Sequence, residues 1–297
     1  MDNPLLALLD LWSRRYSLQK PVATAPITAP ATVLTGASEG IGSALARRFA
    51  EGGHRVVLVA RRQAELQIAA MAIKRDFGVE AVALTIDINE PDAAARIEAA
   101  LTAHGLHADI LINNAGLGLS GRFAALPPAD IDALMSCNII ALTRLSRHFL
   151  PGMLTRRRGG LINVASLAAF TPGPYQAAYY ASKSYVLSLT RAIAYETRGS
   201  GIRVCVVAPG PVKTAFHARM KADTSLYRWL VPAPAPEIVA AAIYWGFRWH
   251  RRIIVPGIAA TILSVMMRVV PSRLVIPVTA LLLYPRGDAA RIRNKAG

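Results

Sequence analysis

The chain has 297 residues, 53% of them hydrophobic, and a mean hydropathy of +0.34, which excludes disorder over most of its length. Its net charge of +16 suggests an anionic partner, such as a phosphorylated cofactor, acidic lipid or nucleic acid, unless it is only a solvated surface. No nucleic-acid motif accompanies the charge, so nucleic acid is not expected. Cys137 and Cys205 lie in apolar runs and are predicted core residues, which fits a reducing, cytoplasmic compartment.

Residues 1–30 are predicted to precede the main domain. A short amphipathic helix is expected over about 4–16, and a linker rich in Pro, Ala and Thr over 18–30. Asp2 and Asp10 interrupt what could otherwise pass for a secretory signal, so we reject that interpretation.

From Ala31 onward, short apolar runs alternate with helical patterns. The predicted strands are 31–36, 55–61, 80–87, 108–116, 160–166, 202–210 and 251–257, and helices are expected over Ile41–Gly53 and Gln63–Phe77 and after each later strand. Strands that are apolar on both faces and separated by helices indicate a parallel sheet covered on both sides. The prediction is therefore an α/β, doubly wound, Rossmann-like domain of about seven strands over residues 31–257.

A glycine-rich turn, TGASEGIG, follows the first predicted strand at 35–42. Gly36 would turn the chain, Gly40 would let the backbone approach a pyrophosphate, and Gly42 would let the next helix lie close to the sheet. The helix N-terminus could then offer its N–H groups to phosphate. The alternative is a turn that binds no ligand. The cofactor candidates of this turn are Gly36, Ser38, Glu39, Gly40, Ile41 and Gly42.

Arg61 and Arg62 follow the second predicted strand, and no acidic residue occurs before Glu65. An acid there would bind the ribose 2′-hydroxyl of NAD, whereas an arginine fits the 2′-phosphate of NADP. The sequence therefore favours NADP (NADPH) over NAD, although both arginines could merely start an exposed helix. Asp87 and Ile88, at the end of the third strand, are expected near the adenine.

The stretch YQAAYYASKS contains one tyrosine with a lysine four residues on, Tyr179 with Lys183. Residues i and i+4 share a helix face, and an ammonium or an oxidised nicotinamide would lower the pKa of a phenol. Tyr179 could then pass a proton to a carbonyl oxygen, with Ser166 stabilising that oxygen from the end of a strand. Tyr175 and Tyr180 have no such partner and are expected to pack against neighbours.

These motifs together resemble the classical short-chain dehydrogenase/reductase family over about residues 31–257. The resemblance rests on TGASEGIG, NNAG at 113–116, Asn138 in CNIIA, Ser166 in NVAS, Tyr179-x-x-x-Lys183, and PGPVKT at 209–214. It implies an NADP-dependent oxidoreductase of EC 1.1.1 type with Asn138, Ser166, Tyr179 and Lys183 as its catalytic residues. In that family pattern Lys183 also holds the nicotinamide ribose, and Asn138 anchors a water that leads protons to Lys183.

The resemblance implies further cofactor contacts. The NNAG segment would line the cofactor and steady the sheet through Asn113, Ala115 and Gly116, with Asn114 also a candidate. The 209–214 loop would meet the nicotinamide carboxamide, although PGP is also a common strand-ending turn. Its candidates are Pro209, Gly210, Val212 and Thr214.

His104 and His107 have the spacing H-x-x-H, which can indicate a metal site. They are predicted to lie in a loop between a helix and a strand, and no third ligand is near in the sequence. We therefore expect surface histidines and no metal.

The segment 215–236 follows the cofactor loop, and such a stretch often covers the substrate in the family. Its apolar side chains could form a lid or could be ordinary helix packing. A lid would suit a hydrophobic ketone or aldehyde, of acyl, terpenoid or steroid-like type, and the choice among them stays open. The candidate lid residues are Phe216, Met220, Leu226, Tyr227, Trp229 and Leu230.

Residues 258–297 form an apolar, basic extension that departs from the common family pattern. The longest uncharged run, 253–267, has fifteen residues, fewer than the roughly 18 that a membrane span needs. Two short amphipathic helices are expected, which could lie on an anionic membrane, on their own domain or on a partner subunit. The extension also makes a four-fold assembly doubtful, while a homodimer through the helices beginning near Pro128 and Pro174 is implied by resemblance.

Two functions follow from these patterns. One is an NADPH-dependent carbonyl reductase, in the cytoplasm or peripheral at the inner face of a membrane. The other is a cofactor-binding regulatory or scaffold protein without turnover. The presence of all four predicted catalytic residues favours the reductase, because a protein that only binds has no chemical need for them.

Overall fold

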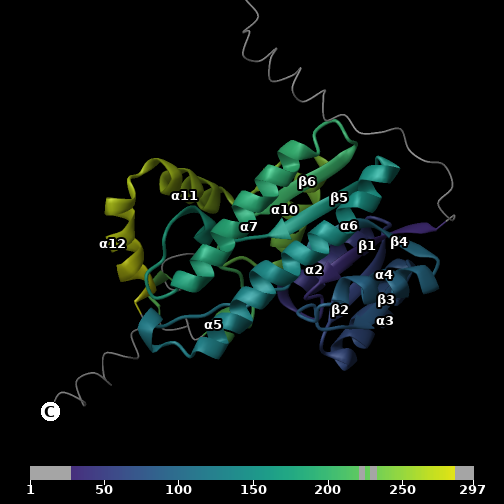
Figure 1. Cartoon of the computed structure of the whole chain (residues 1–297), viewed down its shortest axis with the longest axis horizontal. Helices are drawn as coiled ribbons and strands as arrows, with labels where there is room; N and C mark the ends of the chain where they lie inside the picture. The colour runs from purple at the N-terminus through teal and green to yellow at the C-terminus, as the bar shows by residue number, and fades with distance from the viewer. Residues whose placement is uncertain (1–27, 221–224, 228–232, 285–297) are drawn as a thin grey trace, which may run out of the picture.

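The computed structural model describes residues 28–220, 225–227 and 233–284 (Figure 1). The helix predicted over 4–16, most of the predicted linker, the lid candidates Trp229 and Leu230, and the end of the extension lie outside the described residues.

Seven parallel strands form one sheet in the order β3-β2-β1-β4-β5-β6-β7, which confirms the predicted α/β fold (Figure 1). The chain order reverses between β1 and β4, and doubly wound sheets bind ligands at this position, beyond the carboxyl ends of the strands. The strands are β1 (Ala29–Thr35), β2 (Arg55–Ala60), β3 (Ala81–Thr85), β4 (Leu106–Asn113), β5 (Gly159–Val164), β6 (Ile202–Val207) and β7 (Ile253–Ile254).

The strand boundaries differ from the predicted ones at most ends, by up to three residues, and the first and last strands illustrate why. The first strand begins at Ala29, whose N–H donates to the Gly105 carbonyl at 2.8 Å, so two residues assigned to the linker belong to the sheet. The last strand pairs with β6 only through Ile253 and Ile254. Short pairing is common at a sheet edge, and Pro256, which has no N–H to donate, follows directly.

Helices cover both faces of the sheet. One face packs against α2 (Gly40–Glu51), α3 (Gln63–Phe77, as predicted) and α10 (Pro236–Arg248). The other packs against α4 (Ala93–Ala103), α6 (Leu142–Arg156) and α7 (Ala177–Glu196). Phe49 of α2 is fully buried and meets Tyr244 of α10 edge-on, with ring centroids 5.1 Å apart. These contacts hold the beginning of α2, and therefore the glycine turn, against the sheet.

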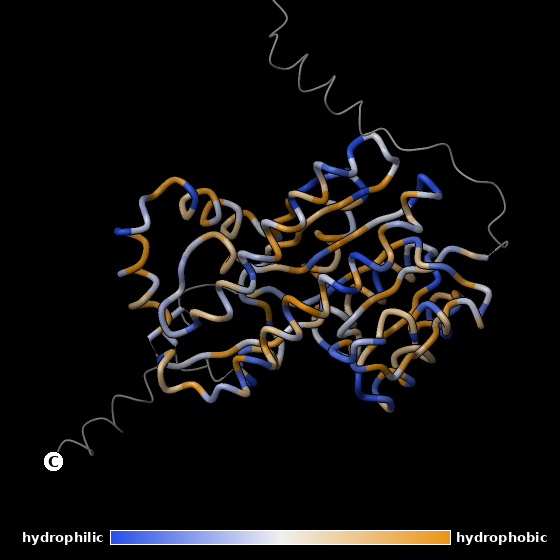
Figure 2. The backbone as a smooth tube through the Cα atoms, in the orientation of Figure 1, coloured by the Kyte–Doolittle hydropathy of each residue, from blue (hydrophilic) through white to orange (hydrophobic). Residues whose placement is uncertain are grey.

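The C-terminal extension forms the two expected short helices, α11 (Ile258–Val269) and α12 (Ser272–Leu283). They lie at the opposite end of the molecule from β3 and α3, and they are apolar over much of their length (Figures 1 and 2). Within the described residues, no helix is both long enough and apolar enough to cross a membrane.

The described part of the extension packs on its own domain. The Arg268 guanidinium lies 4.2 Å from the centroid of the Phe170 ring, and the Thr279 hydroxyl donates to the Pro172 carbonyl at 3.3 Å. The sequence left open whether the extension lies on a membrane, on its own domain or on a partner subunit. The structure shows the second of these for the described residues.

Candidate active site

One cleft of about 580 Å³ opens at the carboxyl ends of the strands and extends toward the extension. Of the predicted catalytic and cofactor-binding residues, Asn113 and Asn138 do not line it. The residues around the cleft are Gly36, Ser38, Glu39, Gly40, Ile41, Gly42, Arg61, Arg62, Asp87, Ile88, Asn114, Ala115, Gly116, Ser166, Tyr179, Lys183, Pro209, Gly210, Val212 and Thr214.

The glycine turn is tight because backbone and side chains fill the space that a Cβ atom would need. A Cβ atom on Gly42 would lie 2.1 Å from the Gly36 carbonyl oxygen. Gly36 itself has φ +65°, a conformation that glycine adopts readily. The Asn114 amide donates to the carbonyls of Thr35 and Gly36 at 3.0 and 3.2 Å, so this residue fastens the turn after β1 to the end of β4.

The N-terminus of α2 points its first N–H groups toward the cleft, and no side chain among the described residues caps them. Such a helix end, reached through glycines, suits a phosphate group. The structure therefore fits the pyrophosphate of a dinucleotide at Gly36–Gly42.

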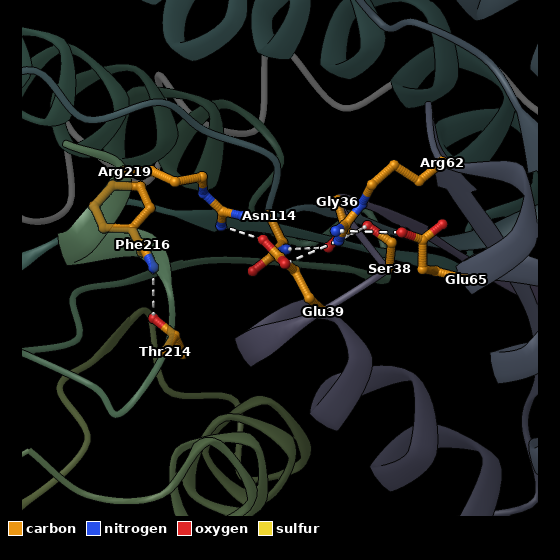
Figure 3. Close-up of polar contacts among 9 residues, drawn as sticks. All are labelled: Gly36, Ser38, Glu39, Arg62, Glu65, Asn114, Thr214, Phe216 and Arg219. Carbon is orange, nitrogen blue, oxygen red and sulfur yellow. Dashed lines mark hydrogen bonds and ion pairs between the residues drawn. The ribbon is translucent and has the colours of Figure 1, made fainter.

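The two arginines after β2 lie at the other side of this turn. The Arg62 guanidinium is 2.9 Å from the Glu39 carboxylate, and it donates to the Ser38 hydroxyl at 2.9 Å (Figure 3). Arg61 is more exposed, and its guanidinium lies 3.9 Å from the Asp87 carboxylate. Two cations at this end of the cleft fit an anionic group on the adenosine ribose.

Glu39 also pairs with Arg219, which belongs to α8 (Phe216–Arg219) (Figure 3). The hydrogen bond from Arg219, and then that from Arg62, lower the pKa of Glu39 against the opposing effect of burial. The glycine turn is thus joined to the segment predicted as a lid. Sequence reasoning missed Arg219, because nothing in the sequence pairs it with a residue 180 positions earlier.

Tyr179 and Lys183 lie on one face of α7, as predicted. The Lys183 ammonium is 5.8 Å from the centroid of the Tyr179 ring and donates to the Val164 carbonyl at 3.1 Å. Burial lowers the pKa of Lys183 to about 8. The ammonium therefore lies at the wall of the cleft, between α7 and the end of β5.

The neighbouring ammonium does not lower the pKa of Tyr179 as expected, whereas the lowering expected from an oxidised nicotinamide stays a prediction. Tyr179 is only 8% exposed, and burial raises its pKa to about 12, although a hydrogen bond with Ser166 acts in the opposite direction. The ammonium lies beside the ring and is itself held below its usual pKa, so burial is the larger effect. The phenol is neutral at pH 7, which is the form that donates a proton.

Asn138 lies in a π-helical turn, Ser136–Ala141, between α5 (Pro128–Met135) and α6. Its side chain is buried, accepts from the Leu117 N–H at 2.8 Å, and donates to the Leu117 carbonyl at 2.9 Å and to the Ser182 hydroxyl at 3.0 Å. A Cβ atom on Gly116 would lie 3.3 Å from both the Asn138 carbonyl oxygen and the Lys183 nitrogen. Asn138 therefore holds the loop after β4 beside the lysine.

Comparison with known proteins identifies the family. The sequence model described as short chain dehydrogenase matches residues 30–225. This chain belongs to the short-chain dehydrogenase/reductase family. A ketoacyl reductase, HetN, of Nostoc sp. is 36% identical over 219 residues, which are 73% of this chain and 75% of that protein.

Two further relatives, one known by sequence and one by structure, are similar to this chain. The very-long-chain 3-oxoacyl-CoA reductase of Anas platyrhynchos is 36% identical over 187 residues, covering 61% of this chain and 59% of that protein. A solved short-chain dehydrogenase from Sphingobium yanoikuyae, in complex with NADPH, is 32% identical with a TM-score of 0.72, covering 80% of this chain and 91% of that chain.

Two predictions need correction, one made from the resemblance and one from the histidine spacing. Asn113 is buried and does not line the cleft. Its side-chain amide donates to the Ser146 hydroxyl at 3.0 Å and to the Asn163 side chain at 2.9 Å, so its contacts lie within the sheet and with α6.

His107 lies within β4 rather than in a loop. It is half-buried, and its ring nitrogen is 2.8 Å from the Thr28 hydroxyl. Among the described residues, no group of three or more His, Cys, Asp or Glu side chains could hold a metal ion.

Part of the segment predicted as a lid borders the cleft. Phe216, Met220 and Tyr227 line the cleft, whereas Leu226 does not. The Phe216 ring centroid is 5.9 Å from that of Tyr179. Phe216 of this segment therefore lies beside Tyr179.

Sequence analysis missed a second wall of the cleft. It comes from α11 and α12, outside the residues that match the family model. A helical spacing was visible in the extension, but the side of each helix that would face the domain was not. The lining residues of this wall are Leu263, Met267, Thr279, Leu282 and Leu283.

Proposed function

We propose that this short-chain dehydrogenase/reductase uses NADP(H) to interconvert a carbonyl group and an alcohol on a hydrophobic substrate. The observation that carries the proposal is the cluster of Tyr179, Ser166 and Lys183 in the same cleft as the glycine turn and the two arginines. The family membership supports oxidoreductase chemistry in that cleft.

The proposed cofactor is NADP(H) rather than NAD(H). Arg62 would exchange its contact with Glu39 for the 2′-phosphate, with Arg61 beside it, and α2 would face the pyrophosphate. Lys183 would hold the nicotinamide ribose, and the 209–214 loop would meet the carboxamide. When bound, NADPH supplies the hydride. The solved relative that carries NADPH supports this choice.

The proposed proton donor is Tyr179. Its raised pKa of about 12 keeps the phenol protonated, so it can donate to a carbonyl oxygen that is becoming an alkoxide. Ser166 would hold the same oxygen, because its hydroxyl is hydrogen-bonded to Tyr179. Lys183, charged below its pKa of about 8, would stabilise the phenolate that remains. Asn138 would keep the lysine and the neighbouring loop in place.

The proposed substrate is a hydrophobic ketone or aldehyde. Phe216, Met220, Leu263 and Met267 are among the apolar residues that line the cleft. Two relatives named as reductases of ketoacyl compounds support a carbonyl beside an apolar chain.

The competing proposal is a protein that binds NADP(H) without turnover. The test is NADPH oxidation with a panel of hydrophobic ketones and aldehydes, using wild type, Tyr179→Phe and Tyr195→Phe. Tyr195 lies on the same helix and is exposed, so it is the matched control. We expect turnover by wild type and Tyr195→Phe, and a loss of at least about 100-fold for Tyr179→Phe with NADPH binding retained. NADPH binding without turnover of any carbonyl compound would favour the competing function.

Association with a membrane and with a second copy are also proposals. Several apolar side chains of α11 and α12 are exposed, and Arg268 and Arg273 lie among them, which supports binding at an anionic membrane surface. Exposed Ile140 and Tyr185, beside α6 and on α7, support the homodimer implied by the family resemblance.

A further inference from the structure

The wall formed by α11 and α12 has two distinct sides. On α11, Leu263 and Met267 are four residues apart, share one helix face and line the cleft, whereas Met266 beside them is 54% exposed. On α12, Leu282 lines the cleft, whereas its neighbour Leu281 is 67% exposed. One side of this helix pair therefore belongs to the cleft and the other faces outward.

The wall is fastened to the segment that carries the proposed chemistry. The Thr279 hydroxyl donates to the Pro172 carbonyl, and the Arg268 guanidinium lies over the Phe170 ring, both in the stretch between Ser166 and α7. The Tyr284 ring meets the Tyr175 ring edge-on at 5.2 Å between centroids. The inner side of α11 and α12 is thus held at a fixed position relative to Ser166 and the start of α7.

The wall also contacts the segment predicted as a lid, at Ser225. The Ser225 hydroxyl donates to the Leu283 carbonyl at 3.3 Å, and Ser225 is fully buried. Phe216 and Met220 line the cleft from the lid side. Between the lid and the wall, a substrate would meet side chains that are mostly apolar.

Charge divides the cleft into two ends. The described charged residues that line it come from the glycine turn, the ends of β2 and β3, α7 and α8, and none comes from α11 or α12; they are Glu39, Arg61, Arg62, Asp87, Lys183 and Arg219. Among the described residues of the extension, neither Arg268 nor Arg273 lines the cleft, and the wall contributes Thr279 as its one polar residue there. An ionised or strongly polar group would lose its hydration at the wall without gaining a partner, whereas an alkyl chain would gain buried area.

We propose that α11 and α12 select the substrate by its apolar body, so that ketones with a long alkyl chain are reduced best. The chain runs from the carbonyl at Tyr179 and Ser166 toward Met267 and Leu282. This inference rests on the proposed reductase function and names the class of substrate. It concerns a region that the family model does not cover.

The test is a series of 2-alkanones from 2-pentanone to 2-tridecanone with NADPH, measured as kcat/KM. The variants are Met267→Ala and Leu282→Ala, each with its outward neighbour as matched control, Met266→Ala and Leu281→Ala. For wild type, kcat/KM should rise with chain length, by several-fold for each methylene that reaches the wall. Met267→Ala and Leu282→Ala should lower kcat/KM for 2-tridecanone about tenfold or more and leave 2-pentanone within about twofold. The controls should leave both substrates unchanged.

The results separate this inference from the proposed function. Turnover of ketones with no dependence on chain length, or equal losses in the Met267→Ala and Met266→Ala variants, would overturn the inference and leave the reductase function intact. If no ketone is turned over, the reductase function fails, and calorimetric binding of 2-tridecanone to the NADP-loaded protein tests the wall alone. Weaker binding in Met267→Ala than in Met266→Ala would then support a selective wall, and equal binding would overturn it.

Discussion

Lys183 and Tyr179 show how burial sets the protonation state of neighbouring groups. The lysine is buried with its nitrogen hydrogen-bonded to the Val164 carbonyl, and its pKa falls to about 8. The tyrosine is buried beside it, and its pKa rises to about 12. Both shifts favour the neutral form, as burial does for any ionisable group.

The lowered pKa of Lys183 predicts how the stability of the protein without cofactor depends on pH. The unfolded chain keeps this proton up to about pH 10.5, whereas the folded protein begins to lose it near pH 8. Because the unfolded state then binds more protons, this lysine makes the free energy of unfolding rise with pH between these values. The Lys183→Met substitution should remove this increase in the free energy of unfolding with pH.

Urea unfolding at pH 7 and pH 9 measures this effect. The stability of wild type relative to Lys183→Met should increase by about 1 kcal/mol over that interval. Lys74→Met, on α3 and exposed, is the control and should show no such change. A difference that is constant with pH would mean that the ammonium keeps its ordinary pKa.

Arg62 is the residue on which the choice between NADPH and NADH is expected to depend. Its guanidinium already binds the Glu39 carboxylate and the Ser38 hydroxyl, which hold it beside the glycine turn. Arg62→Gln should raise KM for NADPH about 10- to 100-fold, because a charge-assisted contact to phosphate is lost. KM for NADH should stay within about twofold. Equal effects on both cofactors in steady-state kinetics would place the 2′-phosphate elsewhere.

At the scale of elements, the ion pair between Glu39 and Arg219 joins the glycine turn to α8. Arg219→Gln should loosen α8, and its amides should exchange hydrogen roughly two- to fivefold faster, as expected for an exposed ion pair. Mass spectrometry of peptides covering 214–220 gives the measurement. Arg203→Gln, on β6, is the control. Unchanged exchange in Arg219→Gln would show that α8 is held by the packing of Phe216 and Met220 instead.

Sequence patterns predicted the elements well where burial is continuous. The predicted strands at 55–61 and 202–210 are apolar at their centres, and the structure has strands there, shorter by one and three residues. The ends of the strands were harder to predict, because a strand ends where its hydrogen bonds to the neighbouring strand end. Pro209 and Pro256 have no N–H to donate to a neighbouring strand. The spacing of Tyr179 and Lys183 correctly placed both on one helix face.

Other features depend on contacts that are distant in the sequence. The raised pKa of Tyr179 follows from its burial beside Phe216 and other residues distant in the sequence, which a helix pattern does not reveal. The pairing of Arg219 with Glu39 and the inward side of α11 arise only when segments distant in the sequence meet at one cleft. The π-helical turn that positions Asn138 likewise has no short sequence signature.

At the scale of the whole molecule, one end of the structure is apolar on its outside. Ile262, Val265 and Val278 are exposed on α11 and α12, and the chain carries no acidic residue between Glu237 and Asp288. Apolar side chains interspersed with arginines favour the interface of an anionic bilayer.

Flotation with liposomes tests this surface. Wild type should float with vesicles of phosphatidylglycerol and phosphatidylcholine, and less with phosphatidylcholine alone or at high salt. The double variant Val265→Asp with Val278→Asp should float less, whereas Ile68→Asp, exposed on α3 at the far end, should float as wild type does. A wild type that stays at the bottom with every vesicle would contradict membrane association.

The position of α11 and α12 after the last strand has a practical consequence. The groups proposed to carry out the reaction end at Lys183, and the loop proposed to meet the nicotinamide ends at Thr214, whereas the wall begins at Ile258. Exchanging only the terminal helices between related reductases should therefore transfer a preference for chain length while the reaction centre is left untouched. Substitutions confined to α11 and α12, whether natural or engineered, should therefore be enough to change which substrates such an enzyme prefers.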